Sequence, residues 1–153
     1  MSETMKNKIW IDNDACPKRI REIIFKAGMR KKIPIKIVAN SYMHPPKGLD
    51  VEMIVVNDGF DAADNYIAEN VAKDDLVITA DIPLADRVIS SGATALSPHG
   101  ELYDQASIQE RLAMRNLMAE LRSAGEVRGG KGEFGDRDVK LFAAVFDRII
   151  ANF

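Results

Sequence analysis

The chain has 153 residues, of which 46% are hydrophobic and 29% are charged, a balance typical of one globular domain. This composition excludes collagen-like, low-complexity and largely disordered chains, and the single cysteine, Cys16, excludes a disulfide scaffold. No run of about 18 apolar residues is present. Residues 1–8 are polar, and no apolar segment of the signal-peptide type follows them. We therefore expect a cytoplasmic protein without a membrane span.

The net charge of −2 excludes a strongly basic molecule that would attract nucleic acid over its whole surface. The charges are nevertheless separated along the chain. Residues 18–32 hold seven lysines and arginines against one acid, Glu22, whereas residues 50–86 hold ten acids against Lys73 alone. A basic segment of this density is able to hold a phosphate backbone.

Short apolar segments alternate with amphipathic segments over the first two thirds of the chain. The patterns predict, in chain order, a strand over 9–11 that ends at Asp12, a helix over 17–31, strands over 35–39 and 51–56, a helix over 61–71, a strand over 76–80, a helix over 83–91 and a strand over 93–96. Strands that alternate with helices in this way are typical of a parallel sheet covered on both faces.

The pattern changes after residue 103. A long helix is predicted over 104–124, with Ile108, Leu112, Met118 and Leu121 facing inward. A glycine-rich loop is expected over 125–135, and a closing helix over 136–150. We predict one α/β domain over 1–153, with a sheet-forming core over 8–103 and a helical part over 104–153. Its architecture is three-layered, with a mostly parallel sheet of about five strands.

Carboxylates gather where the predicted strands end. Asp12 and Asp14 follow the first strand, and Asp81 follows the fourth. Asp61 and Asp64 begin the helix after the third strand and, three residues apart, share one face of it. Because parallel strands end at the same edge of a sheet, we expect these side chains to converge there.

Converging carboxylates repel one another unless a cation or protons neutralise them. Mg²⁺ and Mn²⁺ both prefer oxygen ligands, and either ion lowers the pKa of a bound water and neutralises charge on a phosphodiester. The sequence therefore predicts a site for Mg²⁺ or Mn²⁺. The candidate ligands are Asp12, Asp14, Asp61, Asp64, Asp81 and Asp86.

Each acid also has a structural interpretation. Asp14, Asp61 and Asp81 each stand where a carboxylate can cap the helix that follows, and Asp64 can complete a capping box. The pair Asp74–Asp75 is interpreted as a solvated turn without a functional role.

Basic side chains are candidates for substrate binding. Arg111 and Arg115, four residues apart on the predicted long helix, can grip phosphate or form a solvated face. Lys18 and Arg19 open the basic segment. Cys16 lies near a predicted helix N-terminus, which favours a thiolate, but no partner at motif spacing supports a nucleophile, and we interpret it as a packed thiol.

Five segments in combination resemble the YaiI/YqxD family of bacterial proteins over about residues 8–150: IDNDACP (11–17), GFDAAD (59–64), VITADIPLA (77–85), GATALSPHGELY (92–103) and IQERLAMR (108–115). The family in turn resembles the PIN-like nucleases. That resemblance implies a PIN-like fold in which acids bind Mg²⁺ or Mn²⁺ and cut RNA. On this basis Asp12, Asp61 and Asp81 match the core catalytic acids, and Asp14, Asp64 and Asp86 are candidates for the remaining ones.

Three functions follow as expectations. The first is a divalent-metal-dependent nuclease acting on RNA or another phosphodiester. The second is an aspartyl-phosphate type of phosphatase, in which Asp12 and Asp14 form an Asp-x-Asp motif and Thr79 binds phosphate, although no lysine stands at a predicted strand end. The third is a non-catalytic module that binds nucleic acid or protein and whose acids are only caps.

Overall fold

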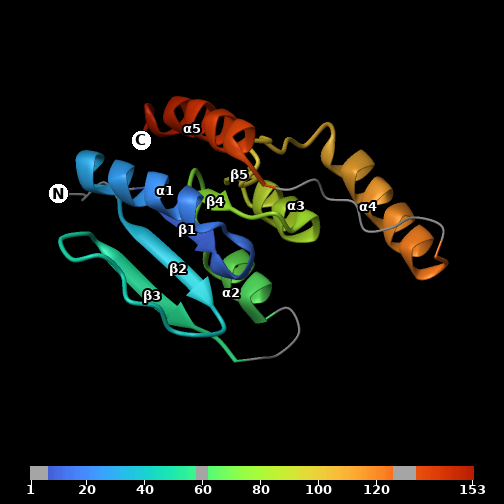
Figure 1. The fold of residues 1–153 in the computed structure, drawn as a ribbon, viewed down its shortest axis with the longest axis horizontal. Coiled ribbons are helices and arrows are strands. Elements are labelled where there is room, and N and C mark those ends of the chain that lie inside the picture. The colour runs from blue at the N-terminus through green and yellow to red at the C-terminus, as the bar shows by residue number, and fades with distance from the viewer. Residues whose placement is uncertain (1–6, 58–61, 126–133) are drawn as a thin grey trace.

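Five parallel strands form one sheet in the computed structural model, which describes residues 7–57, 62–125 and 134–153 (Figure 1). In spatial order the sheet runs β3-β2-β1-β4-β5. The strands are β1 (Ile9–Asp12), β2 (Ile35–Ala39), β3 (Val51–Val55), β4 (Leu76–Ile78) and β5 (Thr94–Leu96). The prediction of a parallel sheet of about five strands is confirmed.

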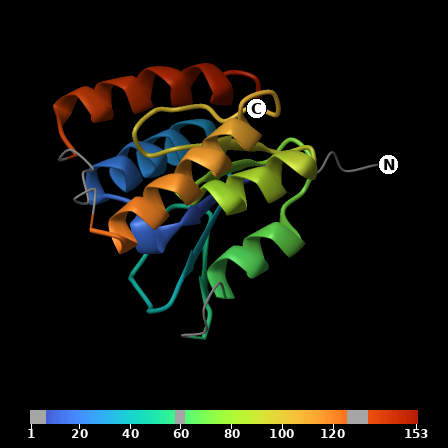
Figure 2. The same ribbon diagram turned by 90° about the vertical axis from the view of Figure 1, so that its right-hand side faces the viewer.

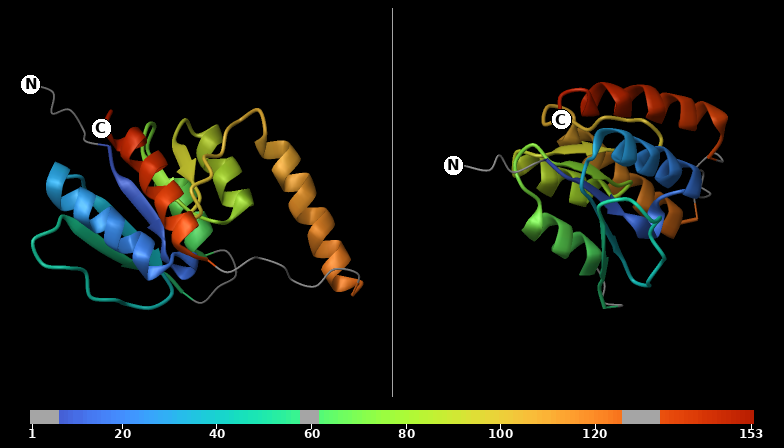
Figure 3. Two further views of the ribbon diagram at one scale, coloured as in Figure 1. Left: turned by 45° about the horizontal axis from the view of Figure 1, so that its top comes forward. Right: turned by 90° about the vertical axis from the view of Figure 1, so that its left-hand side faces the viewer.

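Helices cover both faces of this sheet, as the views along it show (Figures 2 and 3). They are α1 (Lys18–Lys31), α2 (Ala62–Asn70), α3 (Ile82–Ser90), α4 (Ile108–Ser123) and α5 (Asp136–Ile150), with a short 3₁₀ helix η1 (Asn13–Ala15) after β1. Side chains of α1 and α5 pack on one face, and side chains of α2 and α3 pack on the other. Within the described ranges, no helix is both long and apolar enough to cross a membrane.

The alternation of side chains along β1 divides the core between these two faces. Ile9 and Ile11 pack with α1 and α5, whereas Trp10 packs with α2 and α3. All three side chains are buried, because β1 lies in the middle of the sheet. The continuous apolar sequence of the strand is thereby explained.

The beginning and the packing of α4 differ from the prediction. The helix begins at Ile108 rather than at 104, because the Asp104 carboxylate accepts hydrogen bonds from the Ser107 backbone N–H (2.9 Å) and hydroxyl (3.1 Å) and closes a turn there. Of the four residues expected to face inward, Ile108 is buried, whereas Leu112, Met118 and Leu121 are only half-buried. The helix extends away from the rest of the molecule (Figures 1 and 3).

The interpretation of Asp75 as part of a solvated turn is wrong. This residue is 1% exposed, and its carboxylate accepts hydrogen bonds from the backbone N–H groups of Lys8 and Ala72 and from Nε1 of Trp10, each at 2.9 Å. It also forms an ion pair with the Lys8 ammonium group at 3.6 Å. Asp75 therefore connects the beginning of β1 to the turn before β4.

Candidate functional site

Polar residues stand at or just beyond the carboxyl ends of all five strands. They are Asp12, Asn40, Asn57, Thr79 and Ser97, for β1, β2, β3, β4 and β5 respectively. Since the strands are parallel, these residues share one edge of the sheet, where ligands collect in folds of this class. Asn40 and Asn57 were not predicted as site residues, although a polar residue at the end of an apolar strand is a signal visible in the sequence.

Asp12 and Thr79 form the centre of this edge. The pairing of Ile11 with Ile78 places the next residues, Asp12 and Thr79, side by side. The Thr79 hydroxyl donates a hydrogen bond to Oδ2 of Asp12 at 2.8 Å and accepts one from the Asp81 backbone N–H at 3.0 Å. Asp12 is 7% exposed and Thr79 is 1% exposed. The carboxylate is therefore held in one position and largely removed from water.

Asp12 lies on the face of the sheet that α2 covers, because it follows Trp10 by two residues along β1. Asp64 is half-buried in the first turn of α2. Asp61, the third predicted catalytic acid, directly precedes α2 and lies outside the described residues, so its place remains a prediction.

Electrostatics couples three of the predicted acids. Burial raises the pKa of the Asp12 carboxyl above its ordinary value, and the negative charges of Asp14 and Asp81 raise the pKa further, whereas the hydrogen bond from Thr79 acts against the rise. Asp12 thus carries its negative charge at a free-energy penalty that a cation would relieve.

Asp14 does not cap α1, so that interpretation is wrong. The helix begins at Lys18 with Pro17 at its N-cap position and no side-chain cap. The exposed Asp14 carboxylate instead accepts a hydrogen bond from the Asn40 backbone N–H at 3.3 Å, which connects the ends of β1 and β2. By contrast, Asp81 does cap α3, because its Oδ1 accepts the Leu84 backbone N–H at 2.9 Å.

The acids are not assembled around a common point. Among residues 7–57, 62–125 and 134–153, no three His, Cys, Asp or Glu side chains lie close enough together to hold a metal ion. Asp86 contacts Gln109 of α4 at 3.5 Å, and it is half-buried. The donor chemistry of Asp12, Asp14 and Asp81 suits Mg²⁺ or Mn²⁺, but a bound ion requires these carboxylates to move together or requires Asp61.

The predicted substrate-binding residues occupy two separate helices. Lys18 is exposed at the N-terminus of α1, and Arg19 beside it forms an ion pair with Asp136 at 2.9 Å. Because η1 connects β1 directly to α1, both residues lie near the carboxyl edge of the sheet. They remain candidates for phosphate binding.

The two arginines of α4 do not act as a pair in this structure. Arg111 forms an ion pair with Glu101 at 2.7 Å and lies over the Tyr103 ring, 5.3 Å from its centroid. Arg115 is exposed and donates a hydrogen bond to its neighbour Asn116 at 3.3 Å. Binding of one phosphate by both arginines would require the ion pair between Arg111 and Glu101 to break.

Cys16 is a packed thiol. The residue is 7% exposed, and burial raises the pKa of its thiol to about 12, although the nearby Arg21 cation acts against the rise. Arg21 donates hydrogen bonds to the Cys16 carbonyl at 2.8 Å and to the Asn13 side chain at 3.2 Å. The thiol is therefore no nucleophile at neutral pH, and Arg21 holds the turn that positions Asp14.

A polar loop after β5 borders the acidic centre. The His99 backbone N–H donates to the Ser97 hydroxyl at 2.9 Å, and the His99 ring nitrogen Nδ1 lies 2.9 Å from the Asp138 carboxylate of α5. Burial raises the pKa of the Tyr103 hydroxyl, and the charges of Glu101 and Asp81 raise it further, whereas its hydrogen bond with Ser97 acts against the rise. No signal in the sequence indicated this buried tyrosine beside the loop.

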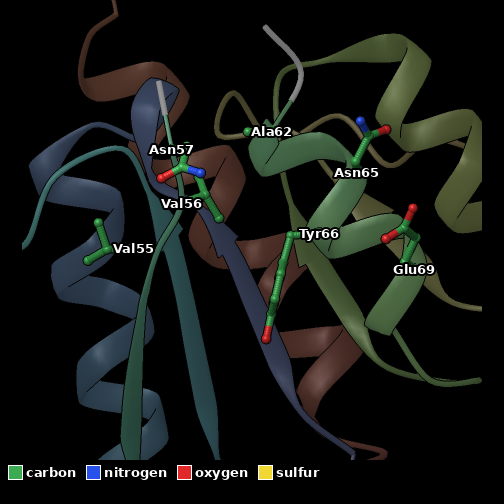
Figure 4. A pocket seen from close by; sticks show the side chains of 7 residues that line it. All are labelled: Val55, Val56, Asn57, Ala62, Asn65, Tyr66 and Glu69. Atoms are coloured by element: carbon green, nitrogen blue, oxygen red, sulfur yellow. The ribbon is translucent and has the colours of Figure 1, made fainter. Parts of the chain in front are cut away.

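A shallow hollow of about 330 Å³ opens between β3 and α2 (Figure 4). Its lining combines apolar and polar side chains, which are Val55, Val56, Asn57, Ala62, Asn65, Tyr66 and Glu69. The Tyr66 ring packs on Trp10 at 6.3 Å between centroids, so this wall is fixed to the core. Because Asn57 follows β3, the hollow reaches the same edge of the sheet as Asp12.

Comparisons with known proteins place this chain in a family by its sequence. A family model described as uncharacterised, YaiI/YqxD, matches residues 10–152. A relative named "UPF0178 protein" from Geobacter metallireducens is 52% identical over 145 residues, which cover 95% of this chain and 94% of the relative. A similarly named protein from Pseudomonas putida is 44% identical over 95% of this chain and 97% of its own length. No solved structure matches the chain.

Proposed function

The chain belongs to the YaiI/YqxD family of uncharacterised bacterial proteins, and we propose that it is a divalent-metal-dependent nuclease that hydrolyses RNA. The observation that carries the proposal is the buried Asp12 carboxylate at the end of β1, held by Thr79 and coupled to the charges of Asp14 and Asp81. Stability of the fold does not require a buried carboxylate at the end of β1, because burial disfavours the ionisation of that carboxylate. Perturbed acids at a ligand-binding edge are typical of functional sites.

In this proposal Asp12, Asp61 and Asp81 are the principal metal ligands. Asp14, Asp64 and Asp86 are secondary candidates. When bound, Mg²⁺ or Mn²⁺ supplies charge neutralisation on the phosphodiester and lowers the pKa of a water. Thr79 orients Asp12 through its hydrogen bond. Lys18 and Arg19, at the N-terminus of α1, attract the RNA backbone.

The parallel sheet with acids after β1 and β4 also supports a PIN-like relationship. Asp12 ends β1, and Asp81 follows β4 within the Thr-x-Asp segment 79–81. The two strands are neighbours in the sheet, at a spacing of about 4.8 Å. We infer that the arrangement corresponds to the core acids of PIN-like nucleases, with Asp61 as the third.

Calorimetric titration with Mn²⁺ tests the metal site, and cleavage of a fluorescent single-stranded RNA tests the activity. We expect Mn²⁺ binding and RNA cleavage in the wild type, and neither in Asp12→Asn or Asp81→Asn. Asp50→Asn is the matched control, because Asp50 is exposed at the opposite edge of the sheet, just before β3. Absence of Mn²⁺ binding in the wild type would overturn the proposed function.

The Asp12–Thr79 hydrogen bond also favours a second candidate, an aspartyl-phosphate phosphatase. In that reaction an Asp12 oxygen attacks phosphorus, and the bond from phosphorus to the ester oxygen breaks, so that the alcohol leaves with a proton taken from solvent. Water then attacks phosphorus, the bond from phosphorus to Asp12 breaks, and phosphate is released. Incubation with a phosphomonoester and mass spectrometry of the quenched protein distinguishes the two reactions. Phosphate trapped on Asp12 would support the phosphatase, whereas RNA cleavage without a phosphorylated protein would support the nuclease.

A non-catalytic binding module is the remaining candidate. It predicts RNA or protein binding without cleavage and without an effect of Mn²⁺. Retention of RNA by the wild type and by Asp12→Asn alike, with no product formed, would favour this function over both hydrolases.

A further inference from the structure

The segment between β2 and β3 holds two exposed aromatic side chains. Tyr42 is 60% exposed, and His44 is exposed as well. Their rings lie edge to face, with 5.2 Å between the ring centroids and an angle of 87° between the ring planes. In such a pair, each ring keeps at least one face that its partner does not cover. The segment leaves the carboxyl end of β2 and returns to the beginning of β3 (Figure 1).

Met43 stands between the two aromatic residues and fixes this segment to the domain. Its side chain is half-buried and packs against the core cluster that contains Cys16 and Ile20. Its sulfur lies 3.4 Å from the amide nitrogen Nδ2 of Asn13 in η1. Because the middle residue is held inward, the aromatic residues on either side of it stand exposed on a fixed support.

The two rings lie beside predicted metal ligands. The backbone N–H of Asn40 donates a hydrogen bond to Oδ1 of Asp14 at 3.3 Å. Tyr42 follows Asn40 by two residues, a span of at most about 7 Å. The residue of η1 that contacts Met43 directly follows Asp12 in the chain. An RNA strand with a phosphodiester at these carboxylates can therefore place a neighbouring base on the rings.

Positive charges border the same place. Lys18 and Arg19 are exposed in the first turn of α1, shortly after η1. Arg21 donates hydrogen bonds to the side chain of Asn13 and to the carbonyl of Cys16, so its cation lies at the same turn. Phosphate oxygens are attracted to cations, and unstacked bases bind to the faces of aromatic rings. A single-stranded RNA carries both groups, so its chemistry matches this surface.

We propose that Tyr42 and His44 form a stacking platform for unpaired bases of an RNA strand whose phosphodiester lies at the acidic centre. The position of the cleaved bond rests on the proposed nuclease function, but the stacking itself requires neither a metal ion nor cleavage. Bases in a duplex are already stacked on their neighbours, whereas unpaired bases offer free faces. The platform therefore recognises single-stranded RNA.

Fluorescence anisotropy with a labelled single-stranded RNA, in EDTA to prevent cleavage, tests the platform. We expect the wild type to bind this RNA, and the double variant Tyr42→Ala, His44→Ala to bind it about tenfold more weakly, since the stacking of a base contributes about this factor. The affinity for the same RNA annealed to its complement should be equal in both proteins. Tyr42→Phe keeps the ring and should retain the wild-type affinity.

A matched control and a fold check accompany these variants. Met114 of α4 is 57% exposed, so Met114→Ala removes an exposed apolar side chain outside the platform and should leave RNA affinity unchanged. Circular dichroism verifies that the double variant is folded.

The salt dependence of binding separates stacking from phosphate contacts. Loss of a phosphate contact reduces the slope of log affinity against log salt concentration, whereas loss of stacking lowers the affinity at every salt concentration. At pH 8 we therefore expect an unchanged slope for Tyr42→Ala, His44→Ala and a smaller slope for Lys18→Ala. A smaller slope for the double variant would mean that its residues act through phosphate, and would overturn the platform.

Three further results would also overturn the platform: a wild type that does not bind the single strand, a double variant with the wild-type affinity, and equal losses of affinity for single-stranded and duplex RNA. Each of these leaves the Mn²⁺ titration and the cleavage assay to decide the nuclease function by themselves. Conversely, ring-dependent RNA binding by a wild type that neither binds Mn²⁺ nor cleaves RNA would support the platform and refute the nuclease.

Discussion

The hydroxyl of Thr79 lies 2.8 Å from Oδ2 of Asp12, and this hydrogen bond joins residues that are 67 positions apart in the chain. The same hydroxyl accepts the backbone N–H of Asp81, so one buried side chain positions two of the predicted metal ligands. The carboxylate is thereby fixed at a place where burial and two neighbouring charges disfavour its ionisation. Without a cation, this arrangement costs folding free energy, whereas a bound cation would be stabilised by the fixed carboxylate.

Asp12→Asn should stabilise the metal-free protein at neutral pH while removing Mn²⁺ binding. The raised pKa means that the folded state binds the Asp12 proton more tightly than the unfolded chain does. The stability of the wild type therefore falls as the pH rises from the unfolded to the folded pKa, and the loss persists above it. Asparagine is neutral and still accepts the Thr79 hydrogen bond.

Thermal unfolding at pH 4 and pH 7 without divalent ions measures this difference. We expect the advantage of Asp12→Asn to be larger at pH 7 than at pH 4. Addition of Mn²⁺ at pH 7 should raise the unfolding midpoint of the wild type only. An unfolding midpoint of Asp12→Asn below that of the wild type at pH 7 would contradict the assignment of Asp12 as an electrostatically strained ligand.

Thr79→Val should raise the pKa of Asp12 further, because the hydrogen bond that favours the ionised carboxylate is lost. The variant should also lose about 1–2 kcal/mol of stability, since the Asp81 N–H loses its acceptor. Thr79→Ser keeps the hydroxyl and should leave both properties nearly unchanged. A carbon-detected NMR titration of the Asp12 carboxyl gives the pKa, and equal pKa values in the valine and serine variants would refute the role of the hydroxyl.

Asp75→Asn should destabilise the fold by about 3 kcal/mol, in contrast to the substitution at Asp12. The Asp75 carboxylate accepts three hydrogen bonds and pairs with Lys8 in a buried position. An amide offers one acceptor oxygen and turns a donor toward these donors. Urea unfolding measures the loss. Asp74→Asn is the control, because Asp74 is exposed with a φ of 70°, which asparagine tolerates.

The contrast between Asp12 and Asp75 also shows how far the sequence could predict the site. Alternating apolar and amphipathic segments are local signals. They predicted the strands, the parallel sheet with helices on both faces, and the placement of Asp12 and Asp81 at one edge of the sheet. The burial of Asp75 depends on donors at Lys8 and Trp10, more than 60 residues away, and no local pattern reports it. The packing of α4 was misjudged for the same reason, because an apolar stripe does not reveal which surface covers it.

Gly100→Ala should destabilise the loop that borders the acidic centre. Gly100 has a φ of +89°, and an added Cβ would lie 2.6 Å from Cγ of Leu141 and 2.8 Å from the backbone nitrogen of Phe142. The loop and α5 are in backbone contact there, so neither can shift easily. The left-handed conformation and the close contact together should reduce stability by about 2–4 kcal/mol.

Gly92→Ala separates these two causes. Gly92 has the same φ of +89°, but its added Cβ would meet only the Lys73 side chain, at 3.3 Å and beyond. We therefore expect a loss of about 1 kcal/mol, from the backbone conformation alone. Urea unfolding of both variants gives the difference, which measures the packing of the loop against α5. Gly100→Ala should also broaden the NMR signals of His99, since the His99–Asp138 contact at 2.9 Å joins this loop to α5. Equal losses of stability in the two variants would mean that the loop moves away from the added Cβ without cost. In that case, α5 would not hold the β5 side of the site in place.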